Sequence, residues 1–399
     1  MPYFALFLLH SSIFLLHHAP LTSKQILGIL VIYSDKDTGT MNQNVSRSSS
    51  KQRNTIAEIA AKAGVSIPTV SRVLNNKPDV APATRERVEL IIRQSGFVRN
   101  RSANALRKGS SGIVDIIIPD LTNAYSIEIL CGVQEVIERT DLRLALSTGH
   151  DDLHNEQRWL AKVMDGATDG GILVLAHGQS EHLDALHRLN IPFVIVDHRG
   201  ELGPDIPSVG STNVLGGRLA TEYLLSLGHR RIAIISGIST IRASQERIVG
   251  YRTTLEEAGI AVDPELIRPG EFKQHTGYEQ TCALLALPQP PTAIFAGSDT
   301  QAMGVYSALR AHGISIPDDM SVVGFDDVSI ASLVTPMLTT VRQPLMEMGR
   351  VATTMLLRLI AGEPLDSMRV ELTTTLVIRE SCTPLLPRAH EDNLSSTTA

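Results

Sequence analysis

Short hydroxyl side chains and one arginine lie close together around residue 70. The stretch reads Ser66-Ile-Pro-Thr-Val-Ser-Arg72. Hydroxyl groups and a guanidinium near the start of a helix can hydrogen-bond to base edges and phosphates in the major groove of a duplex. We therefore expect Thr69, Ser71 and Arg72 to contact double-stranded DNA, provided that small helices hold them in place.

The surrounding residues predict three such helices. Thr55 and Glu58 have the spacing of a capping box, so a first helix begins directly after Thr55. Gly64 ends it, because a left-handed C-cap favours glycine. Ser66 caps a second helix, and a third occupies residues 82–95. Three short helices joined by tight turns are typical of a helix-turn-helix head.

Charge is divided unevenly along the chain. Residues 41–110 hold 13 Lys and Arg against 4 Asp and Glu, whereas residues 111–399 hold 21 against 36. A basic head on an acidic body is the distribution of a DNA-binding module joined to a domain that does not bind DNA.

Chain length and cysteine usage limit the number of structural units and the kinds of site that the chain can hold. A chain of 399 residues favours two or three structural units. Its cysteines, Cys131, Cys282 and Cys382, are far apart and form no CxxC pair, so neither a disulfide framework nor a metal site is expected. A reduced, cytoplasmic compartment fits this pattern, and DNA binding would associate the protein with the nucleoid.

The first residues differ from the rest. The apolar runs 4–16 and 26–33 are shorter than the roughly 20 residues of a membrane span, and no signal-peptide pattern is present. We interpret residues 1–53 as an N-terminal extension and expect translation to begin at Met41, with no membrane partner.

From residue 112 onward, short β-branched runs alternate with helical patterns, which indicates an α/β fold with parallel sheets. Ligands of such sheets bind beyond the carboxyl ends of the strands, which points to residues 119–125, 197–199, 297–299 and 325–327. The predicted strands are 113–118, 142–147, 171–175, 193–196, 232–236, 293–296 and 322–325, and the predicted helices include 215–227, 247–258 and 300–311.

No enzyme motif was found: GxxxxGK[ST], HExxH, GxSxG and the dinucleotide-binding glycine pattern are all absent. We therefore expect no catalytic residues and no cofactor. Asp326-Asp327 would suit a metal or an acid/base pair, but a carboxylate that accepts a ligand hydroxyl is the preferred interpretation.

The run Thr-Ile-Ala-x-Ile-Ala-x-x-Ala-Gly-Val-Ser-x-x-Thr-Val-Ser-Arg-Val-Leu-Asn, followed by Thr84-Arg-Glu-Arg-Val88, resembles the lac-repressor (LacI/GalR) family of bacterial transcription regulators. The resemblance covers nearly all the chain from Met41 to Pro384. It implies a helix-turn-helix head (54–98), a hinge helix and linker (99–111), and a two-lobe sensor like the type I periplasmic binding proteins (112–384).

The hinge follows from the resemblance alone. Residues 100–107 look like a segment that folds on DNA, with Leu106 as a wedge in the minor groove. Two positions depart from the family: Ala81 replaces a hydroxyl cap, and Arg99 replaces a proline. The full set of expected DNA-binding residues is Thr55, Ser66, Thr69, Val70, Ser71, Arg72, Asn75, Arg99, Asn100, Ala105 and Leu106.

The resemblance also implies the limits of the two lobes. Lobe 1 is expected at about 112–209 and 335–361, and lobe 2 at about 210–334 and 362–384. The tail, 385–399, carries no heptad, so a homodimer on a palindromic operator is expected rather than a coiled-coil tetramer.

Some effector-binding positions of the family have the same residue type in this sequence, and others do not. Ala124 replaces the proline of the usual Asn-Pro-Phe loop, and Gln245 stands where sugar-responsive members often have arginine. Asp326 matches an acidic residue that accepts ligand hydroxyls. The expected effector residues are Asn123, Tyr125, Asp197, Arg199, Gln245, Arg247, Phe272, Asp299 and Asp326.

Together these features predict an effector-controlled, sequence-specific transcription regulator, a repressor in its most common form. Polar groups around an aromatic ring favour a sugar as effector, because each buried hydroxyl needs a partner. A purine or nucleoside is the alternative effector. A small-molecule binding protein without specific operator recognition is the alternative function, and a sugar-processing enzyme comes third.

Overall fold

A computed structural model describes residues 54–97, 110–148, 168–177 and 181–385. It divides into two units, with the boundary between Arg99 and Asn100. The predicted start at Met41, the hinge residues Arg99, Asn100, Ala105 and Leu106, and the tail beyond Leu385 all lie outside the described residues.

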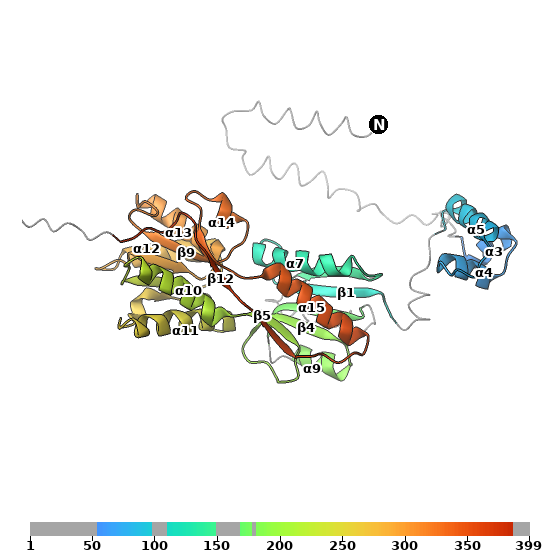
Figure 1. Ribbon diagram of the computed structural model, residues 1–399, viewed down its shortest axis with the longest axis horizontal. Coiled ribbons are helices and arrows are strands. Elements are labelled where there is room, and N and C mark those ends of the chain that lie inside the picture. Colours follow the sequence, from blue (N-terminus) through green and yellow to red (C-terminus); the bar gives the residue numbers. More distant parts are fainter. Residues whose placement is uncertain (1–53, 98–109, 149–167, 178–180, 386–399) are drawn as a thin grey trace, which may run out of the picture. The chain divides into compact units, whose positions relative to one another are not determined.

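The first unit is a small helical head. Its helices are α3 (Ile56–Ala63), α4 (Ile67–Leu74) and α5 (Pro82–Ser95), shown in blue in Figure 1. The predicted capping box is confirmed: the backbone nitrogen of Glu58 donates to Thr55 Oγ1 at 3.3 Å, and that of Thr55 donates to Glu58 Oε2 at 3.2 Å. Gly64 ends α3 at φ 61°, the left-handed conformation expected there.

One apolar cluster holds the three helices together. Helices this short are unstable alone in water, so their packing stabilises them. Phe97, after α5, packs against the cluster. Its buried members are Ile59, Ala60, Ala63, Val70, Val73, Val80 and Val88.

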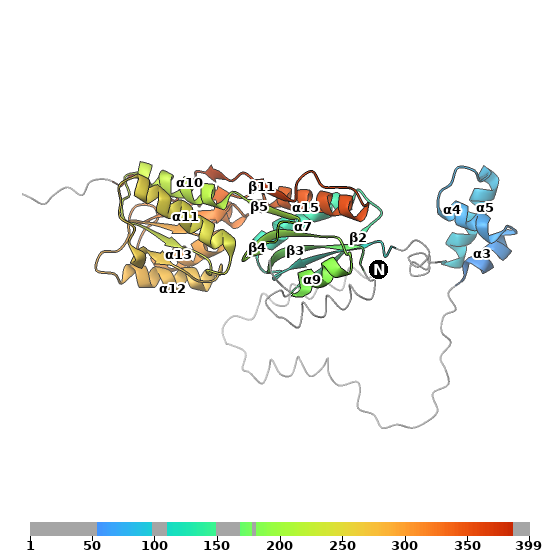
Figure 2. The ribbon, with the colours of Figure 1, turned by 90° about the horizontal axis from the view of Figure 1, so that it is seen from below.

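The second unit begins with the sheet of lobe 1, whose strand order is β11-β5-β4-β3-β1-β2 with every pair parallel. Helices α7 and α15 lie on one face and α9 on the other (Figure 2). The elements are β1 (Ile113–Ile118), α7 (Ala124–Ile137), β2 (Arg143–Thr148), β3 (Gly170–His177), α9 (Glu181–Arg188), β4 (Phe193–Arg199), β5 (Ser208–Ser211), α15 (Leu345–Ile360) and β11 (Arg369–Leu372).

Helices α7 and α15 pack closely because glycine occupies their contact. A β-carbon at Gly132 would lie only 1.9 Å from the carbonyl oxygen of Met346. The core beneath the pair contains Ile129, Met348 and Leu356, none of which is exposed. The C-terminal helix is therefore an integral part of lobe 1.

Lobe 2 has a sheet of order β12-β10-β9-β8-β6-β7, in which β12 alone pairs antiparallel. Helices α10 and α11 cover one face, and α12 and α13 the other (Figure 2). The elements are α10 (Asn213–Ser226), β6 (Ile232–Ile235), α11 (Arg242–Glu257), the 3-10 turn η1 (Pro264–Leu266), β7 (Ile267–Arg268), α12 (Gln274–Leu285), β8 (Ala293–Ala296), α13 (Asp299–Ala311), β9 (Ser321–Asp326), α14 (Ile330–Leu333), β10 (Thr339–Arg342) and β12 (Thr375–Val377).

The chain crosses between the lobes three times, and two of the predicted crossings are wrong. The first crossing follows β5, close to the predicted lobe boundary at residues 209–210. The second follows β10, not Thr335, because β10 pairs with β9 inside lobe 2. The third lies between β11 and β12, not at Gly362, because β11 pairs with β5 in lobe 1.

Two general features bear on function. Among the described residues, no helix has both the length and the apolar character that a membrane span requires. Over the same residues, no cluster of His, Cys, Asp and Glu side chains has the arrangement of a metal site.

Candidate functional site

Helix α4 carries the candidate DNA contacts. Ser66 Oγ accepts a hydrogen bond from the backbone nitrogen of Thr69 at 3.3 Å and lies 2.9 Å from Thr69 Oγ1. The Ser66 oxygen therefore caps the helix, while Thr69 and Ser71 remain partly exposed. This hydrogen bond orders the first turn of α4.

Arg72 and Asn75 lie further along α4 with exposed side chains. Arg72 Nε lies 3.5 Å from an Asp79 carboxylate oxygen, and both side chains are more than half exposed, at 58% and 57%. An exposed pair of this kind contributes little to stability, so its arginine is free to exchange partners. Asn75 Nδ2 donates to the carbonyl oxygen of Ser71 at 2.8 Å.

Val70 does not belong to this surface. Its side chain is 0% exposed in the core of the head, so its assignment as a DNA-binding residue is wrong. The sequence did not predict two hydrogen bonds of Arg85 within the head. Arg85 donates to Asn76 Oδ1 at 3.0 Å and to the carbonyl oxygen of Lys77. These bonds hold the turn between α4 and α5.

Lobe 1 contributes Tyr125 and Asp197 to the candidate effector site. Asn123 Oδ1 caps α7 by accepting from the backbone nitrogen of Tyr125 at 3.1 Å, which fixes the start of the helix. Tyr125 Oη donates to Asp197 Oδ2 at 2.5 Å, and both side chains are buried. The first turn of α7 and strand β4 thus meet in one hydrogen bond.

Lobe 2 contributes Arg247, which is 3% exposed. Its Nε donates to Asn213 Oδ1 at 2.9 Å, and Nη1 donates to the carbonyl oxygen of Gly297. The guanidinium carbon lies 3.7 Å from the ring centroid of Phe325 and 5.4 Å from that of Phe272. Hydrogen bonds at the edge and aromatic rings on its faces hold the cation in one orientation.

Asp326 ends β9 and is 6% exposed. Its Oδ1 accepts from Gln343 Nε2 at 2.6 Å, and Gln343 Oε1 accepts from Ser211 Oγ at 2.5 Å. Ser211 precedes the first crossing and Gln343 follows β10, at the second. The carboxylate is therefore joined through one amide to two of the segments that connect the lobes.

Tyr125, Asp197, Arg247 and Asp326 form what we call the interlobe cluster. Helix α11 of lobe 2 contacts β4 of lobe 1, and the charges of Arg247 and Asp326 both act on Tyr125. Asp197 and Asp326 have positive φ angles of 47° and 110°, a conformation that is costly outside glycine. Strain at two strand ends that face each other is typical of a ligand site.

Burial controls the protonation of the cluster. It raises the pKa of Asp326 to about 7, although Arg247 and the Gln343 hydrogen bond oppose the rise. Burial likewise raises the pKa of Asp197, and raises that of Tyr125 well above its ordinary value. The Arg247 guanidinium stays charged, because arginine does not deprotonate in proteins. The cluster thus combines one fixed cation with two carboxyl groups that resist ionisation.

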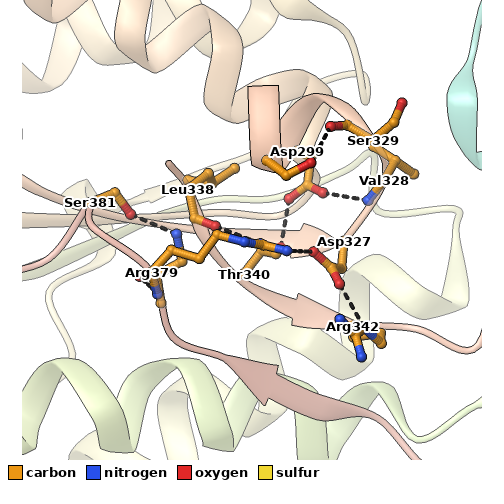
Figure 3. A network of polar contacts seen from close by, with 11 residues as sticks. Asp299, Asp327, Val328, Ser329, Leu338, Thr340, Arg342, Arg379 and Ser381 are labelled. Carbon is orange, nitrogen blue, oxygen red and sulfur yellow. Dashed lines mark hydrogen bonds and ion pairs between the residues drawn. The ribbon is translucent and has the colours of Figure 1, made fainter. Parts of the chain in front are cut away.

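Asp299 was predicted to bind effector, and the structure corrects this assignment. It is 0% exposed, and its oxygens accept from Thr340 Oγ1 at 2.6 Å and from the backbone nitrogen of Val328 at 2.9 Å (Figure 3). Burial, followed by the charge of Asp326, raises its pKa well above the ordinary value. Asp299 therefore supports the loop after β9 from inside lobe 2.

Asp327 anchors the same loop from the other side. Its carboxylate accepts from Arg342 Nε and Arg379 Nη2, each at 2.6 Å (Figure 3). Arg342 ends β10, and Arg379 follows β12. The pair of adjacent carboxylates at the end of β9 is thus explained: Asp326 joins the interlobe cluster and Asp327 fixes its backbone.

The other predicted effector residues occupy different places. Gln245 is exposed and donates to the carbonyl oxygen of Ser239 at 2.6 Å, so it lies apart from the interlobe cluster. Arg199 is partly buried and forms a β-bridge with Ile241 of lobe 2. Phe272 is partly buried beneath Arg247, as an aromatic floor requires.

Two cavities accompany these residues. A small one of about 60 Å³ adjoins Asp197, Asn213, Arg242 and Glu246, between the lobes. A larger one of about 870 Å³ is lined by α13, by the loop around α14 and by Thr122 and Ala124, but by none of the predicted effector residues. Of these two cavities, only the small one therefore adjoins the interlobe cluster, through Asp197.

Sequence reasoning missed Asn213, Ser211 and Gln343, although each touches the interlobe cluster or its partner. Gln343 could have been found, because it follows the β-branched run Thr339-Thr-Val341 as the other site residues follow their strands. Asn213 and Ser211 had no such signal, since the short strand β5 was not recognised.

Comparison with known proteins agrees with both units. A family model described as bacterial regulatory proteins, lacI family, matches residues 55–100. A second model, described as a periplasmic binding protein-like domain, matches residues 221–382. The first match covers the helical head, and the second covers most of lobe 2 together with α15 and β11 of lobe 1.

Whole-length relatives extend the match across both lobes. The ribose operon repressor of Halalkalibacterium halodurans is 33% identical over 327 residues, which cover 82% of this chain and 96% of that protein. A solved transcriptional regulator CelR–cellobiose complex is 32% identical with a TM-score of 0.65, covering 82% of this chain and 100% of the other.

The lac repressor dimer, solved with operator and the anti-inducer ONPF, aligns with a TM-score of 0.74 and 26% identity, covering 83% of this chain and 100% of that one. A head of three helices, a body of two lobes around a buried charged cluster, and full-length similarity above 30% identity lead to one assignment. The chain belongs to the lacI family of bacterial regulatory proteins.

Proposed function

We propose that this protein is an effector-responsive transcription regulator that represses by binding a specific operator as a homodimer. The interlobe cluster carries the proposal, because it brings buried polar side chains of both lobes together at the ends of their strands. The head supplies the DNA contacts through Thr69, Ser71 and Arg72. Operator binding would place the protein on the nucleoid, and no catalytic step is proposed.

The cluster favours an uncharged, polyhydroxylated effector. Two carboxyl groups and a tyrosine offer acceptors and donors to ring hydroxyls, and Phe272 offers an apolar face. The single cation, Arg247, already donates to Asn213 and to the Gly297 carbonyl. A phosphate group would therefore meet two acidic residues without a free arginine, so a neutral sugar should bind better than its phosphate ester.

Relatives supply the first candidates. One is a ribose operon repressor, and one structure holds cellobiose. The lac repressor is a dimer on its operator, which supports the same assembly here. A pseudo-palindromic operator would match the symmetry of such a dimer.

A thermal-shift screen with ribose, cellobiose, ribose 5-phosphate and adenosine tests the effector. A ligand at about 100 Kd adds roughly 2.7 kcal/mol of stability, so a true effector raises the unfolding temperature measurably. Asp326→Ala should abolish the shift, while Gln245→Ala, at an exposed position outside the cluster, should retain it. An adenosine shift without any sugar shift would instead favour the nucleoside alternative.

Selection of duplexes from a random library tests operator recognition. The protein should enrich a palindromic sequence and bind it far more tightly than unrelated DNA at the same salt concentration. Arg72→Ala should weaken that binding, whereas Arg93→Ala, on the exposed face of α5, is the matched control. Binding that is equal for all sequences and lost with salt would support a non-specific role and refute the proposal.

A further inference from the structure

The carboxylate of Asp169 binds the three described residues that precede β1. Its Oδ2 accepts from Ser110 Oγ at 2.7 Å and from the backbone nitrogen of Gly112 at 2.8 Å. Its Oδ1 accepts from the backbone nitrogen of Ser111 at 2.6 Å and from Ser111 Oγ at 3.0 Å. Both oxygens of one side chain are thus used on one short segment.

Asp169 is itself held by the lobe 1 sheet. Its backbone nitrogen donates to the carbonyl oxygen of Ile113 at 2.8 Å, and the neighbouring Thr168 Oγ1 donates to the same oxygen at 3.1 Å. Gly112 adopts φ 69°, so the chain turns sharply as it enters β1. The carboxylate spans this turn from a position that the sheet fixes.

Strand pairing alone does not require these four bonds. Val114 already pairs with Gly170 in the parallel β1–β3 ladder, and Ile113 pairs with Arg143 of β2. The carboxylate instead binds residues that come before the ladder, on the part of the chain that leads back to the head. Hydrogen bonds to an ionised acceptor are stronger than neutral ones, so this attachment is firm.

We propose that Asp169 is a positioning residue that fixes where the segment joining the head to the body leaves lobe 1. The attachment fixes this exit point to the lobe 1 sheet. A movement of lobe 1 is therefore transmitted to the segment that leads to the head. The inference rests on the proposed function, since it concerns how operator binding depends on the sensor body.

The test compares Asp169→Asn with the unchanged full-length chain. Asparagine keeps the size of the side chain but faces one pair of donors with its own NH2 group, so about half of the bonds are lost. Asp205→Asn is the matched control, because Asp205 is an exposed carboxylate elsewhere in lobe 1. Affinity is measured for the duplex that the unchanged chain selects and for an unrelated duplex, well below the unfolding temperature.

We expect Asp169→Asn to weaken binding of the selected duplex by about tenfold, a value within the roughly 5–150-fold range of coupling between sites. Binding of the unrelated duplex should not change, because the basic head is intact. A purely structural role would lower the unfolding temperature and leave both affinities alone, and that result would overturn the inference.

A second variant covers the case in which Asp169→Asn does not fold. The double change Ser110→Ala and Ser111→Ala removes two hydroxyl donors but keeps the carboxylate and its two backbone bonds. It should weaken the selected duplex by a smaller factor, and an unchanged affinity would count against the attachment. Failure of the unchanged chain to select any duplex would refute the proposed function itself, which separates the two outcomes.

Discussion

Replacing Asp326 by asparagine should remove a large part of the pH dependence of folding. In the folded protein, burial raises the pKa of Asp326 to about 7. In an unfolded chain the pKa of an aspartate is about 3.9. Between these values the folded state holds a proton that the unfolded state has lost, so the unfolding free energy falls as pH rises.

The size of the effect follows from that window. One pH unit within it corresponds to about 1.4 kcal/mol, so passing from about pH 5 to about pH 8 should cost the unchanged protein about 3 kcal/mol through Asp326 alone. Asparagine has no proton to lose and can still accept from Gln343 Nε2. The variant should therefore gain about 3 kcal/mol on the unchanged protein between the two pH values, while its effector binding is lost.

Urea unfolding of both full-length chains at the two pH values, followed by circular dichroism, measures the difference. Comparing the two chains cancels contributions from other groups. Asp205→Asn controls for the loss of one exposed carboxylate and should show the pH dependence of the unchanged protein. Equal stability differences at both pH values would show that Asp326 is ionised throughout and that the argument from burial is wrong.

Three further predictions concern stability. Thr340→Val removes the buried hydroxyl that donates to Asp299 and should cost about 1–3 kcal/mol in thermal unfolding, whereas Thr340→Ser, which keeps the hydroxyl, should cost less. Ala81→Ser supplies the missing side-chain cap of α5 and should stabilise the head by about 1 kcal/mol. An unchanged melting temperature of the head would contradict this. Burial lowers the pKa of His229, whose ring contacts Ser321 Oγ at 3.0 Å, so its stabilisation is present above about pH 6.5 and is lost as pH falls. His229→Gln should therefore flatten the acid side of the stability profile in urea unfolding, and an unchanged acid slope would contradict this.

Much of the fold could be predicted because its central strands are short apolar runs. The structure confirms β1 and β8 with the predicted bounds and places β9 within one residue at each end. The missed strands lie toward or at the sheet edges and are short or partly polar; they are β5, β7, β10, β11 and β12. Their residues show no periodic pattern, and pairing with a neighbouring strand holds them in place.

The same reasoning applies to the candidate site. Tyr125, Asp197 and Asp326 were predicted because each follows a recognisable strand, and the structure brings them together with Arg247. Gln343 was missed because strand β10, which it follows, was not recognised, and its contact with Ser211, 132 residues away, exists only through the crossings.

Two site assignments were wrong because they rested on position in the sequence. Val70 was included with the hydroxyl residues beside it, although the 3.6-residue repeat turns it inward. Asp299 was included because it follows a strand, but its position at the start of α13 directs the carboxylate toward Thr340 and Val328. Local sequence shows the polarity of each segment, and only the packing decides which side chains are buried in the core.

The returning C-terminal segment has a consequence for biosynthesis. Lobe 1 needs α15 and β11, and lobe 2 needs β12, so neither lobe is complete before about residue 377 has left the ribosome. The head, by contrast, needs only residues up to Phe97. During translation the DNA-binding module can therefore fold first, while both sheets keep an unpaired edge until the final strands arrive. A transcript that ends early would release a head able to fold but no finished sensor to control it.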